Sequence, residues 1–414
     1  MTTAEVHVIG AGLWGLAVAY ELVTQSPGTK VHLWDRNEGP ACGISALPAS
    51  IITSLRSDVD QVDLSLRTLR LIQQFEREDP GCTGWKGAGS VYLCNEEGTQ
   101  AICKQYAMAK SLGLDVEWLD ARAVSVLAPW LDKTSWNQAI WLPREGYVDA
   151  YLLAQAFWNR AKAAGVEAHW NISIDRLVVE NQQVSGFVTS TQEHMSATCI
   201  VVAAGPWSNV LLHQHGCAVP MAPVRSQYWI TAKHETEFPS NASMVFYPQH
   251  RWYVRPESGA LLFGVRETQG IAHDARNLTT DISRYVGNVD DPMGLNDLHE
   301  SYETLVSCIP ALRSKGLAHH VSGPSSYTLD SQPTIGPLTQ VQGLWVATGC
   351  NGSGVAYCAG VGQRLTRALL ADPTGQTKNE LPYSWNPSRV TDLDPFDAGF
   401  LNACARTRSS KFSG

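Results

Sequence analysis

Three glycines near the start of the chain have the spacing of a phosphate-binding turn. Gly10, Gly12 and Gly15 form a G-x-G-x-x-G pattern directly after a short apolar run at 5–9. In such a turn the first glycine permits the tight bend, the second lets a pyrophosphate approach the backbone, and the third lets the next helix pack against the strand. The N-terminus of that helix then offers N–H groups and a positive dipole end to the phosphates.

An acidic residue stands where the ribose of a dinucleotide would need one. A strand is predicted over 30–34 and closes on Asp35, 20 residues after Gly15. The carboxylate of Asp35 can accept hydrogen bonds from adenosine ribose hydroxyls. A glycine-rich turn in an ordinary α/β domain is the plainer interpretation. The strand, the turn, the helix predicted after it and the acid together favour a dinucleotide site.

Two distant segments indicate which dinucleotide it is. Residues 199–204 form a continuous apolar run, typical of a strand buried on both faces, and lead into Gly205. A second buried strand over 344–347 leads through Gly349 into a glycine-rich loop and a helix predicted over 355–371. The start of that helix can stabilise negative charge on the pyrimidine side of a reduced flavin. A nicotinamide enzyme has no obvious need for this element, so the pattern favours a flavin.

Periodicity and turn residues predict the remaining elements. Apolar spacing indicates four more helices and a hairpin, and a stretch rich in aromatic and β-branched residues indicates an antiparallel sheet. The helices are expected at 59–78, 101–112, 121–128 and 150–164, the hairpin at 173–180 and 184–190, and the sheet within 224–266. The segment 377–414 has no clear period, and we expect a tail that packs on the body or is partly mobile.

Composition excludes several classes of protein. Lys and Arg number 31 against 39 Asp and Glu, a net charge of −8 over 414 residues, so nucleic acids and anionic membranes are poor partners. Mean hydropathy is −0.14, and no apolar run approaches a membrane span. We expect neither a transmembrane segment nor a signal peptide, and a cytoplasmic location. The cysteines contain no C-x-x-C and the histidines no H-E-x-x-H, so a disulfide scaffold and a catalytic metal are not expected.

An ordered set of motifs resembles the D-amino-acid oxidase superfamily of FAD enzymes, on the branch with glycine oxidase, sarcosine oxidase and D-amino-acid dehydrogenase. The matching pieces are VIGAGLWG (8–15), GYVDA (146–150), CIVVAAGPWS (199–208), YVRPESGALLFGVRE (253–267), LDSQPTIGP (329–337) and GLWVATGCNGSGVAYCAGVG (343–362). The resemblance implies an α/β flavoprotein of two domains. A Rossmann-like FAD-binding domain would comprise 1–78, 146–218 and 328–376, and a substrate domain on an antiparallel sheet would comprise 79–145 and 219–327.

The resemblance also implies the residues that hold FAD. Gly10, Gly12 and Gly15 would bind the pyrophosphate, and Asp35 the ribose. The other implied cofactor contacts are Leu13, Trp14, Arg36, Cys42, Ser45, Ala46, Leu47, Ile174, Ala204, Gly205, Trp207, Gly349, Asn351, Gly352, Ser353, Gly354 and Val355.

The chain departs from its relatives on the substrate side. Glycine oxidase-like members carry an Arg that clamps the substrate carboxylate where this chain has Ser325, and a second basic residue where it has Gly352. Sarcosine oxidases tether FAD to a Cys at the position of Gly323, place a Lys at Ala356, and activate oxygen with a Lys at Leu262. The resemblance therefore predicts non-covalent FAD, with no lysine assistance to oxygen at these positions.

The residues left for the substrate pocket are mostly aromatic or basic. Tyr253 matches a tyrosine that contacts substrate in the family, and Tyr253, Arg255 and Glu267 are the candidates for a catalytic role. The expected substrate-binding residues are Tyr253, Arg255, Tyr228, Arg225, Arg56, Glu267 and Gly352. For each one a structural role is the alternative, since an Arg in a strand pair is often a surface ion-pair former.

These residues suggest oxidation of the C–N bond of an amine or amino acid, in which a hydride passes to flavin N5 and an imine forms. Without the usual carboxylate clamp, the substrate would be a larger or modified amino acid, or an amine lacking that carboxylate, and Glu267 would pair with a cationic group. O2, a quinone or a partner protein would accept the electrons. A 2-hydroxy-acid oxidase or dehydrogenase on the same scaffold and a non-catalytic flavoprotein subunit remain alternatives.

Overall fold

One sheet of the protein gathers strands from distant parts of the chain. The computed structural model describes residues 5–56, 58–282, 285 and 290–410. The six-stranded sheet has the order β18-β19-β12-β1-β2-β8, and all neighbours are parallel except β18 and β19. Its strands are β1 (Glu5–Ile9), β2 (Lys30–Trp34), β8 (Glu167–His169), β12 (Ile200–Val202), β18 (Thr334–Pro337) and β19 (Leu344–Thr348).

The strand order reverses at β1, which lies between β12 and β2. Ligands of open parallel sheets bind outside the carboxyl ends of the strands at such a switch point. Gly10, Asp35 and Gly349 directly follow β1, β2 and β19, and Gly205 follows β12 closely. The residues singled out by their chemistry therefore meet at one edge of the sheet.

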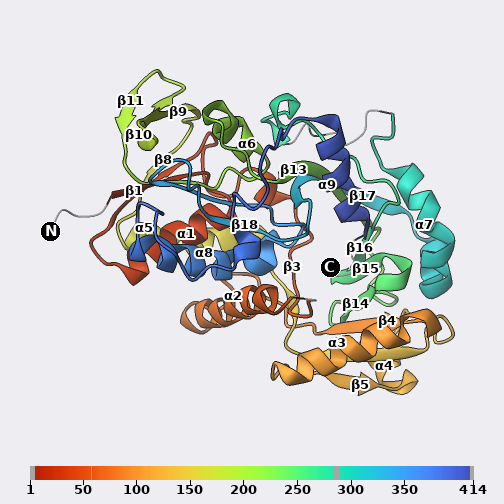
Figure 1. Cartoon of the computed structure of the whole chain (residues 1–414). Coiled ribbons are helices and arrows are strands. Elements are labelled where there is room, and N and C mark those ends of the chain that lie inside the picture. Colours follow the sequence, from red (N-terminus) through yellow and green to blue (C-terminus); the bar gives the residue numbers. More distant parts are fainter. Residues whose placement is uncertain (1–4, 57, 283–284, 286–289, 411–414) are drawn as a thin grey trace.

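Four helices pack closely on this sheet or on one another. They are α1 (Leu13–Gln25), α2 (Val59–Glu78), α5 (Ala150–Ala163) and α8 (Gly354–Ala371), which lie side by side in Figure 1. Glycines in α8 permit the close approach, because a Cβ on Gly362 would lie 2.7 Å from the backbone of Ala17 in α1. A Cβ on Gly360 would lie 2.5 Å from Cα of Leu64 in α2.

A second, larger sheet is built mainly from antiparallel strands. Its order is β17-β13-β16-β15-β14-β4-β6-β5, with a parallel pair at β14 and β4. The strands are β4 (Ser90–Cys94), β5 (Glu117–Leu119), β6 (Gln138–Leu142), β13 (Met221–Thr231), β14 (Met244–Tyr247), β15 (Trp252–Glu257), β16 (Ala260–Val265) and β17 (Leu317–Thr328). The expected mixed α/β fold class is confirmed. We propose that the two domains divide along the two sheets.

Smaller elements complete the fold. Beside the second sheet lie α3 (Thr99–Ser111), α4 (Ala121–Leu127) and α7 (Leu295–Cys308) (Figure 1). The predicted hairpin is β9 (Ile174–Glu180) and β10 (Gln183–Thr189), with β11 (His194–Ser196) at its edge. A short pair joins β3 (Ile51–Ile52) to β7 (Gly146–Tyr147), and α6 (Ser208–Leu212) follows β12.

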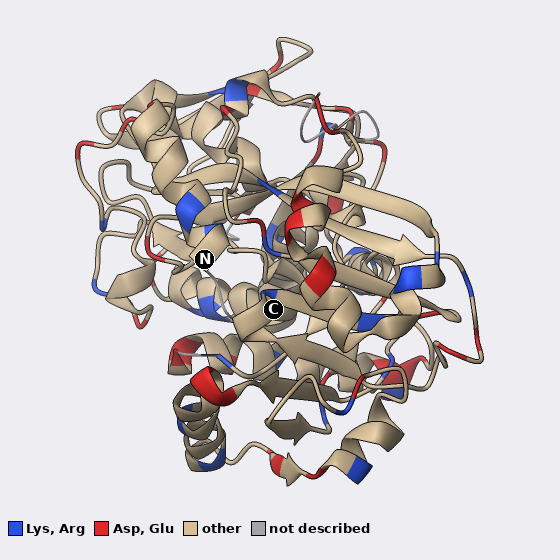
Figure 2. Ribbon diagram, turned by 90° about the vertical axis from the view of Figure 1, so that its right-hand side faces the viewer, with Lys and Arg blue, Asp and Glu red and all other residues tan. Residues whose placement is uncertain are grey.

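The charge of the molecule is spread over the fold. Figure 2 shows Lys and Arg interspersed with Asp and Glu along the ribbon. The charge that a bound molecule meets is therefore set locally, by the residues that line its site.

Among the described residues, no helix combines the length and apolarity that crossing a membrane requires.

The C-terminal segment contains a helix that the sequence analysis missed. Within the expected tail, α9 (Ala398–Ser410) packs on β13 and β17 (Figure 1). Its buried face consists of Phe400, Cys404, Ala405 and Arg408. Only one of these is a large apolar residue, so the helical period gives a weak hydrophobic signal.

A buried ion pair fixes α9 to the sheet. The guanidinium of Arg408 donates from Nε and Nη2 to both carboxylate oxygens of Glu267, at 2.9 and 2.8 Å. Its Nη1 donates to Ser226 Oγ and Tyr327 OH, each at 3.1 Å. The side chains are 5% and 0% exposed. Removing one partner would leave the other charge buried and uncompensated.

We expect Arg408→Met to lower the free energy of unfolding of the apoprotein by about 3 kcal/mol or more, because the Glu267 carboxylate loses its bidentate partner. Arg406→Met is the matched control, since Arg406 lies on the exposed face of α9. Urea denaturation of both variants measures the difference. Equal stability of the two variants would show that the ion pair does not anchor the helix.

Candidate functional site

Backbone packing accounts for two of the three N-terminal glycines. Gly10 has φ of +109°, and a Cβ there would lie 2.4 Å from the carbonyl oxygen of Ala203. A Cβ on Gly15 would lie 1.8 Å from the carbonyl oxygen of Gly10. No side chain fits at either position, so β1, the end of β12 and the first turn of α1 are held in direct contact.

Gly12 is different, because little protein lies where its side chain would be. A Cβ on Gly12 would meet only Ser45 Oγ, at 3.1 Å, and its φ of −69° suits any residue. Gly12 lines a cavity of about 390 Å³. The glycine therefore preserves cavity space rather than a protein contact, as a pyrophosphate-binding backbone requires.

The N-termini of two long helices meet at this cavity. Gly12 caps α1 and Ser353 caps α8, and neither residue makes a side-chain cap bond, although Leu13 N of α1 donates to Ser45 Oγ at 3.1 Å. The two helix starts are joined by the indole of Trp14, whose Nε1 donates to the carbonyl oxygen of Gly354 at 2.9 Å. Both helix ends favour negative charge, so the cavity suits an anionic group such as a dinucleotide phosphate.

Asp35 is held in place by the glycine turn itself. Its Oδ2 accepts from Ala11 N at 2.7 Å, and its Oδ1 accepts from the backbone and side-chain nitrogens of Asn37 at 2.9 Å. Each oxygen of an ionised carboxylate can accept further hydrogen bonds, and Asp35 lines the cavity. The residue is thus positioned to receive ribose hydroxyls.

A cation–π pair lies beside Asp35. The guanidinium of Arg36 lies over the ring of Trp207, 4.2 Å from its centroid, and both residues line the cavity. Burial lowers the pKa of the Arg36 guanidinium, an effect that Asp35 opposes. Arg36 stays cationic at neutral pH, since an arginine pKa starts far above 7.

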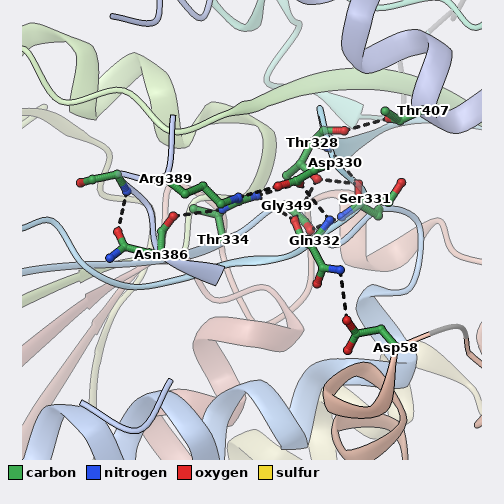
Figure 3. A network of polar contacts seen from close by, with 12 residues as sticks. Asp58, Thr328, Asp330, Ser331, Gln332, Thr334, Gly349, Asn386, Arg389 and Thr407 are labelled. Carbon is green, nitrogen blue, oxygen red and sulfur yellow. Dashed lines mark hydrogen bonds and ion pairs between the residues drawn. The ribbon is translucent and has the colours of Figure 1, made fainter. Parts of the chain in front are cut away.

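The loop before α8 is fixed by contacts with the end of β17. The side chain of Asn351 accepts from Thr328 N at 2.9 Å and donates to Gly349 O at 2.8 Å. The neighbouring turn, shown in Figure 3, is held by Arg389, which donates to both carboxylate oxygens of Asp330 at 2.8 and 3.0 Å. Thr407 of α9 donates to the carbonyl oxygen of Thr328 at 2.8 Å. The C-terminal segment therefore braces the loop that leads into α8.

The cavity reaches from the six-stranded sheet to the second sheet and brings most of the predicted site residues together. Those on its lining are Gly10, Gly12, Leu13, Trp14, Asp35, Arg36, Ser45, Leu47, Arg56, Ile174, Ala204, Gly205, Trp207, Tyr228, Tyr253, Gly349, Gly352, Ser353, Gly354 and Val355. Ser325, at the position of the relatives' carboxylate clamp, also lines it.

Other predicted residues do not lie on the lining. These are Gly15, Cys42, Ala46, Arg225, Arg255, Glu267 and Asn351. Gly15 and Asn351 act through the packing described above, and Cys42 is solvent-exposed.

Three charged candidates for substrate binding are occupied by protein partners instead. Arg225 pairs with Asp297. Arg255 pairs with Glu257 and donates to the carbonyl oxygen of Ala49 at 2.8 Å. The carboxylate of Glu267 is matched by Arg408, so the expectation that Glu267 faces a substrate cation loses its geometric basis.

The structure adds lining residues that the sequence analysis missed. They include Ser226, Gln227, Arg266, Ser326, Tyr327 and Arg408. Arg266 directly follows β16, whose residues are all buried, so no alternation along the strand marked its side chain. No sequence signal pointed to Arg408, because the helix that carries it was not expected.

Charge is unevenly distributed along the cavity. The acidic lining residues, Asp35 and Asp175, belong to the part beside the six-stranded sheet and its hairpin. Arg56, Arg266 and Arg408 line the remainder, and Glu267 neutralises the last of these. Among the described residues, arginine is therefore the charged residue type that lines the part of the cavity away from the six-stranded sheet.

Two tyrosines also face the cavity from the second sheet. Burial raises the pKa of Tyr228 to about 12 and raises that of Tyr253, so both are neutral phenols at pH 7. A Cβ on Gly264 would lie 2.4 Å from Cζ of Tyr253, so this glycine makes room for the ring. The described lining contains no His, Lys or Glu.

Comparisons with known proteins give the chain a context. The sequence profile of the DAO family, described as FAD dependent oxidoreductase, matches residues 5–368. Mouse mitochondrial dimethylglycine dehydrogenase is 24% identical over 99% of this chain and 48% of its own length. Mouse mitochondrial sarcosine dehydrogenase is 24% identical over 89% of this chain and 40% of its own length. The chain thus spans about half the length or less of these two relatives.

Solved structures share the fold. L-proline dehydrogenase from P. horikoshii superposes with a TM-score of 0.79 at 20% identity, covering 94% of this chain and 97% of that one. Glycine oxidase from Geobacillus kaustophilus gives a TM-score of 0.73 at 21% identity, covering 94% and 100%.

Gly12→Ala and Gly15→Ala test the two roles of the glycine turn. We expect Gly12→Ala to leave the stability of the apoprotein nearly unchanged and to weaken FAD binding by about tenfold or more, because the new methyl group fills cavity space. Gly15→Ala should destabilise the apoprotein itself, since its Cβ overlaps the Gly10 carbonyl. Thermal unfolding and FAD titration separate these outcomes. Unchanged FAD affinity in Gly12→Ala would contradict the assignment.

Proposed function

Because the chain belongs to the DAO family of FAD-dependent oxidoreductases, we propose that it oxidises the C–N bond of an amino acid that keeps its carboxylate. One observation carries the proposal: a single cavity joins the dinucleotide-type glycine turn to an arginine-lined region at the second sheet. Dimethylglycine, sarcosine, L-proline and glycine, in the names of similar proteins, all carry an amine and a carboxylate.

The residues around the glycine turn fit FAD. The Gly12 backbone and the start of α1 would receive the pyrophosphate, and Asp35 the ribose. The start of α8, at Gly352 to Val355, would face the flavin and favour negative charge there. When bound, FAD supplies the group that accepts the two electrons of the oxidation. We propose non-covalent binding.

Arg56 and Arg266 are the proposed partners of the substrate carboxylate. Both line the cavity, and the guanidinium of Arg56 lies over the ring of Tyr357 in α8, 5.3 Å from its centroid. Arg266 lines the same cavity as Tyr253, and its charge partly offsets the burial that raises the pKa of that phenol. The absence of an arginine at Ser325 therefore does not require a substrate without a carboxylate.

The substrate amine would enter the cavity as the neutral base. The described lining contains no His or Lys to remove a proton, and Tyr228 and Tyr253 stay protonated. The phenols and the tyrosine rings would instead orient the amine and exclude water. The electron acceptor would be O2, a quinone or a protein. Oxygen consumption during turnover separates O2 from the other two.

Anaerobic mixing of the FAD-loaded protein with a panel of compounds tests the function. The panel includes N-methylated and cyclic amino acids, their decarboxylated amines and 2-hydroxy acids. We expect amino acids to bleach the flavin absorbance, with a rate that rises as pH increases through the pKa of the substrate amine. Bleaching by 2-hydroxy acids alone would sink the proposal, as would no bleaching by any compound.

Arg56→Met and Arg266→Met test how the carboxylate is recognised. Loss of a charge-assisted hydrogen bond costs about 1.5–3 kcal/mol, so we expect the Kd of a carboxylated substrate to rise by about tenfold or more in at least one variant. The decarboxylated analogue, measured on the same variants, is the control and should be unaffected. An equal loss for both compounds would indicate a structural role for these arginines.

A further inference from the structure

A cluster of histidines and glutamates lies on one face of the six-stranded sheet, at β1, β2 and β8. Cross-strand register places His7 beside His32, and His32 beside Glu167. Glu5 is two residues before His7 in β1, and His169 two residues after Glu167 in β8, so their side chains share that face. The cluster is separate from the lining of the cavity.

Three ligand-type atoms converge within this cluster. Nδ1 of His32 lies 3.1 Å from Nε2 of His169 and 3.5 Å from Oε2 of Glu167. All three atoms lie within 4.8 Å of one another. Two imidazole nitrogens on a tetrahedral zinc ion, each about 2.0–2.1 Å from the metal, are separated by about 3.3 Å. The spacing of the two histidine nitrogens already approaches that value.

Hydrogen bonding decides which histidine can offer a lone pair. The indole Nε1 of Trp34 donates to Nδ1 of His7 at 3.2 Å. Because an indole is only a donor, neutral His7 must carry its proton on Nε2, which lies 3.3 Å from Oε1 of Glu5. His7 is 2% exposed, so it is also closed off from solvent. His7 therefore turns its N–H toward Glu5 and has no lone pair to offer a metal ion.

Glu5 acts on His32 in the same way. Its Oε1 also lies 3.3 Å from Nε2 of His32, a position that favours the tautomer protonated on Nε2. That tautomer leaves the lone pair on Nδ1, the atom that faces His169 and Glu167. A carboxylate behind a ligating histidine is the usual outer partner of a metal site, since it orients the ring and fixes the tautomer.

We propose that Nδ1 of His32, Nε2 of His169 and Oε2 of Glu167 bind a divalent transition-metal ion of the Zn²⁺ type, with Glu5 as the outer-shell carboxylate. Two imidazoles and one carboxylate suit Zn²⁺, and water would complete the tetrahedron because Glu167 is exposed. In the metal-free protein a proton lies between the two histidine nitrogens, and metal binding displaces it.

The ion would tie the edge strand β8 to β2 near the cavity. The ring of His169 stacks on Trp34 with centroids 3.8 Å apart, and its carbonyl oxygen accepts from Asp35 N at 3.1 Å. Since β8 has only three residues, a metal bridge would add substantially to its attachment. This role is structural and does not depend on the proposed redox function.

Calorimetric titration of untagged, chelator-treated FAD-loaded protein with Zn²⁺ tests the site. We expect one saturable Zn²⁺ per chain. Glu167→Gln and His169→Gln should each weaken binding by more than about tenfold, and Glu5→Gln by about tenfold to a hundredfold. His194→Gln, which removes an exposed histidine of β11, should bind Zn²⁺ as the unmodified protein does.

The Glu167 variant keeps the test decisive if other variants misfold. Its side chain is 70% exposed, so Glu167→Gln should fold and unfold as the metal-free parent does. A parent protein without saturable Zn²⁺ binding would overturn the proposal and leave a simple histidine–histidine hydrogen bond. Unchanged affinity in Glu167→Gln would overturn it as well.

Discussion

The close contact between the backbones of Gly10, Gly15 and Ala203 is the constraint on which the site depends. A methyl group on either glycine would overlap a carbonyl group, so β1, the end of β12 and the start of α1 can meet only at these residues. This contact aims the N-terminus of α1 across the carboxyl edge of the sheet. Asp35 is then fixed by accepting from Ala11 in the same turn. Packing alone therefore forms the binding site at the carboxyl edge of the sheet, without help from a ligand.

The C-terminal segment joins the second sheet to that edge. Arg389 holds the turn after β17, Thr407 holds Thr328, and Arg408 pairs with Glu267 at the end of β16. Through Thr328 and Asn351 these contacts extend to the loop before α8. The position of the α8 N-terminus relative to the second sheet thus depends on residues after 380. The cavity is lined by residues of both sheets and by Arg408, from a segment with little hydrophobic signal.

Much of the fold could be predicted because its signals are local. The G-x-G-x-x-G turn, the apolar runs that became β12 and β19, and the periodic helix α2 each carry their pattern in consecutive residues. The helix α9 was missed because its buried face has only one large apolar residue, beside two small residues and an arginine. The partners of Arg225 and Glu267 could not be foreseen either, since an ion pair between residues such as 267 and 408 leaves no trace in local sequence. Arg56 was named as a candidate and lines the cavity, whereas Arg266 reaches it just after β16 through geometry that periodicity does not specify.

The central claim is that separate segments of this chain together hold one FAD. The most direct measurement is the flavin content of the purified full chain, by visible absorbance and by release of the cofactor with acid. We predict one FAD per chain, all of it released on denaturation. A colourless protein that stays colourless after incubation with excess FAD would contradict the account.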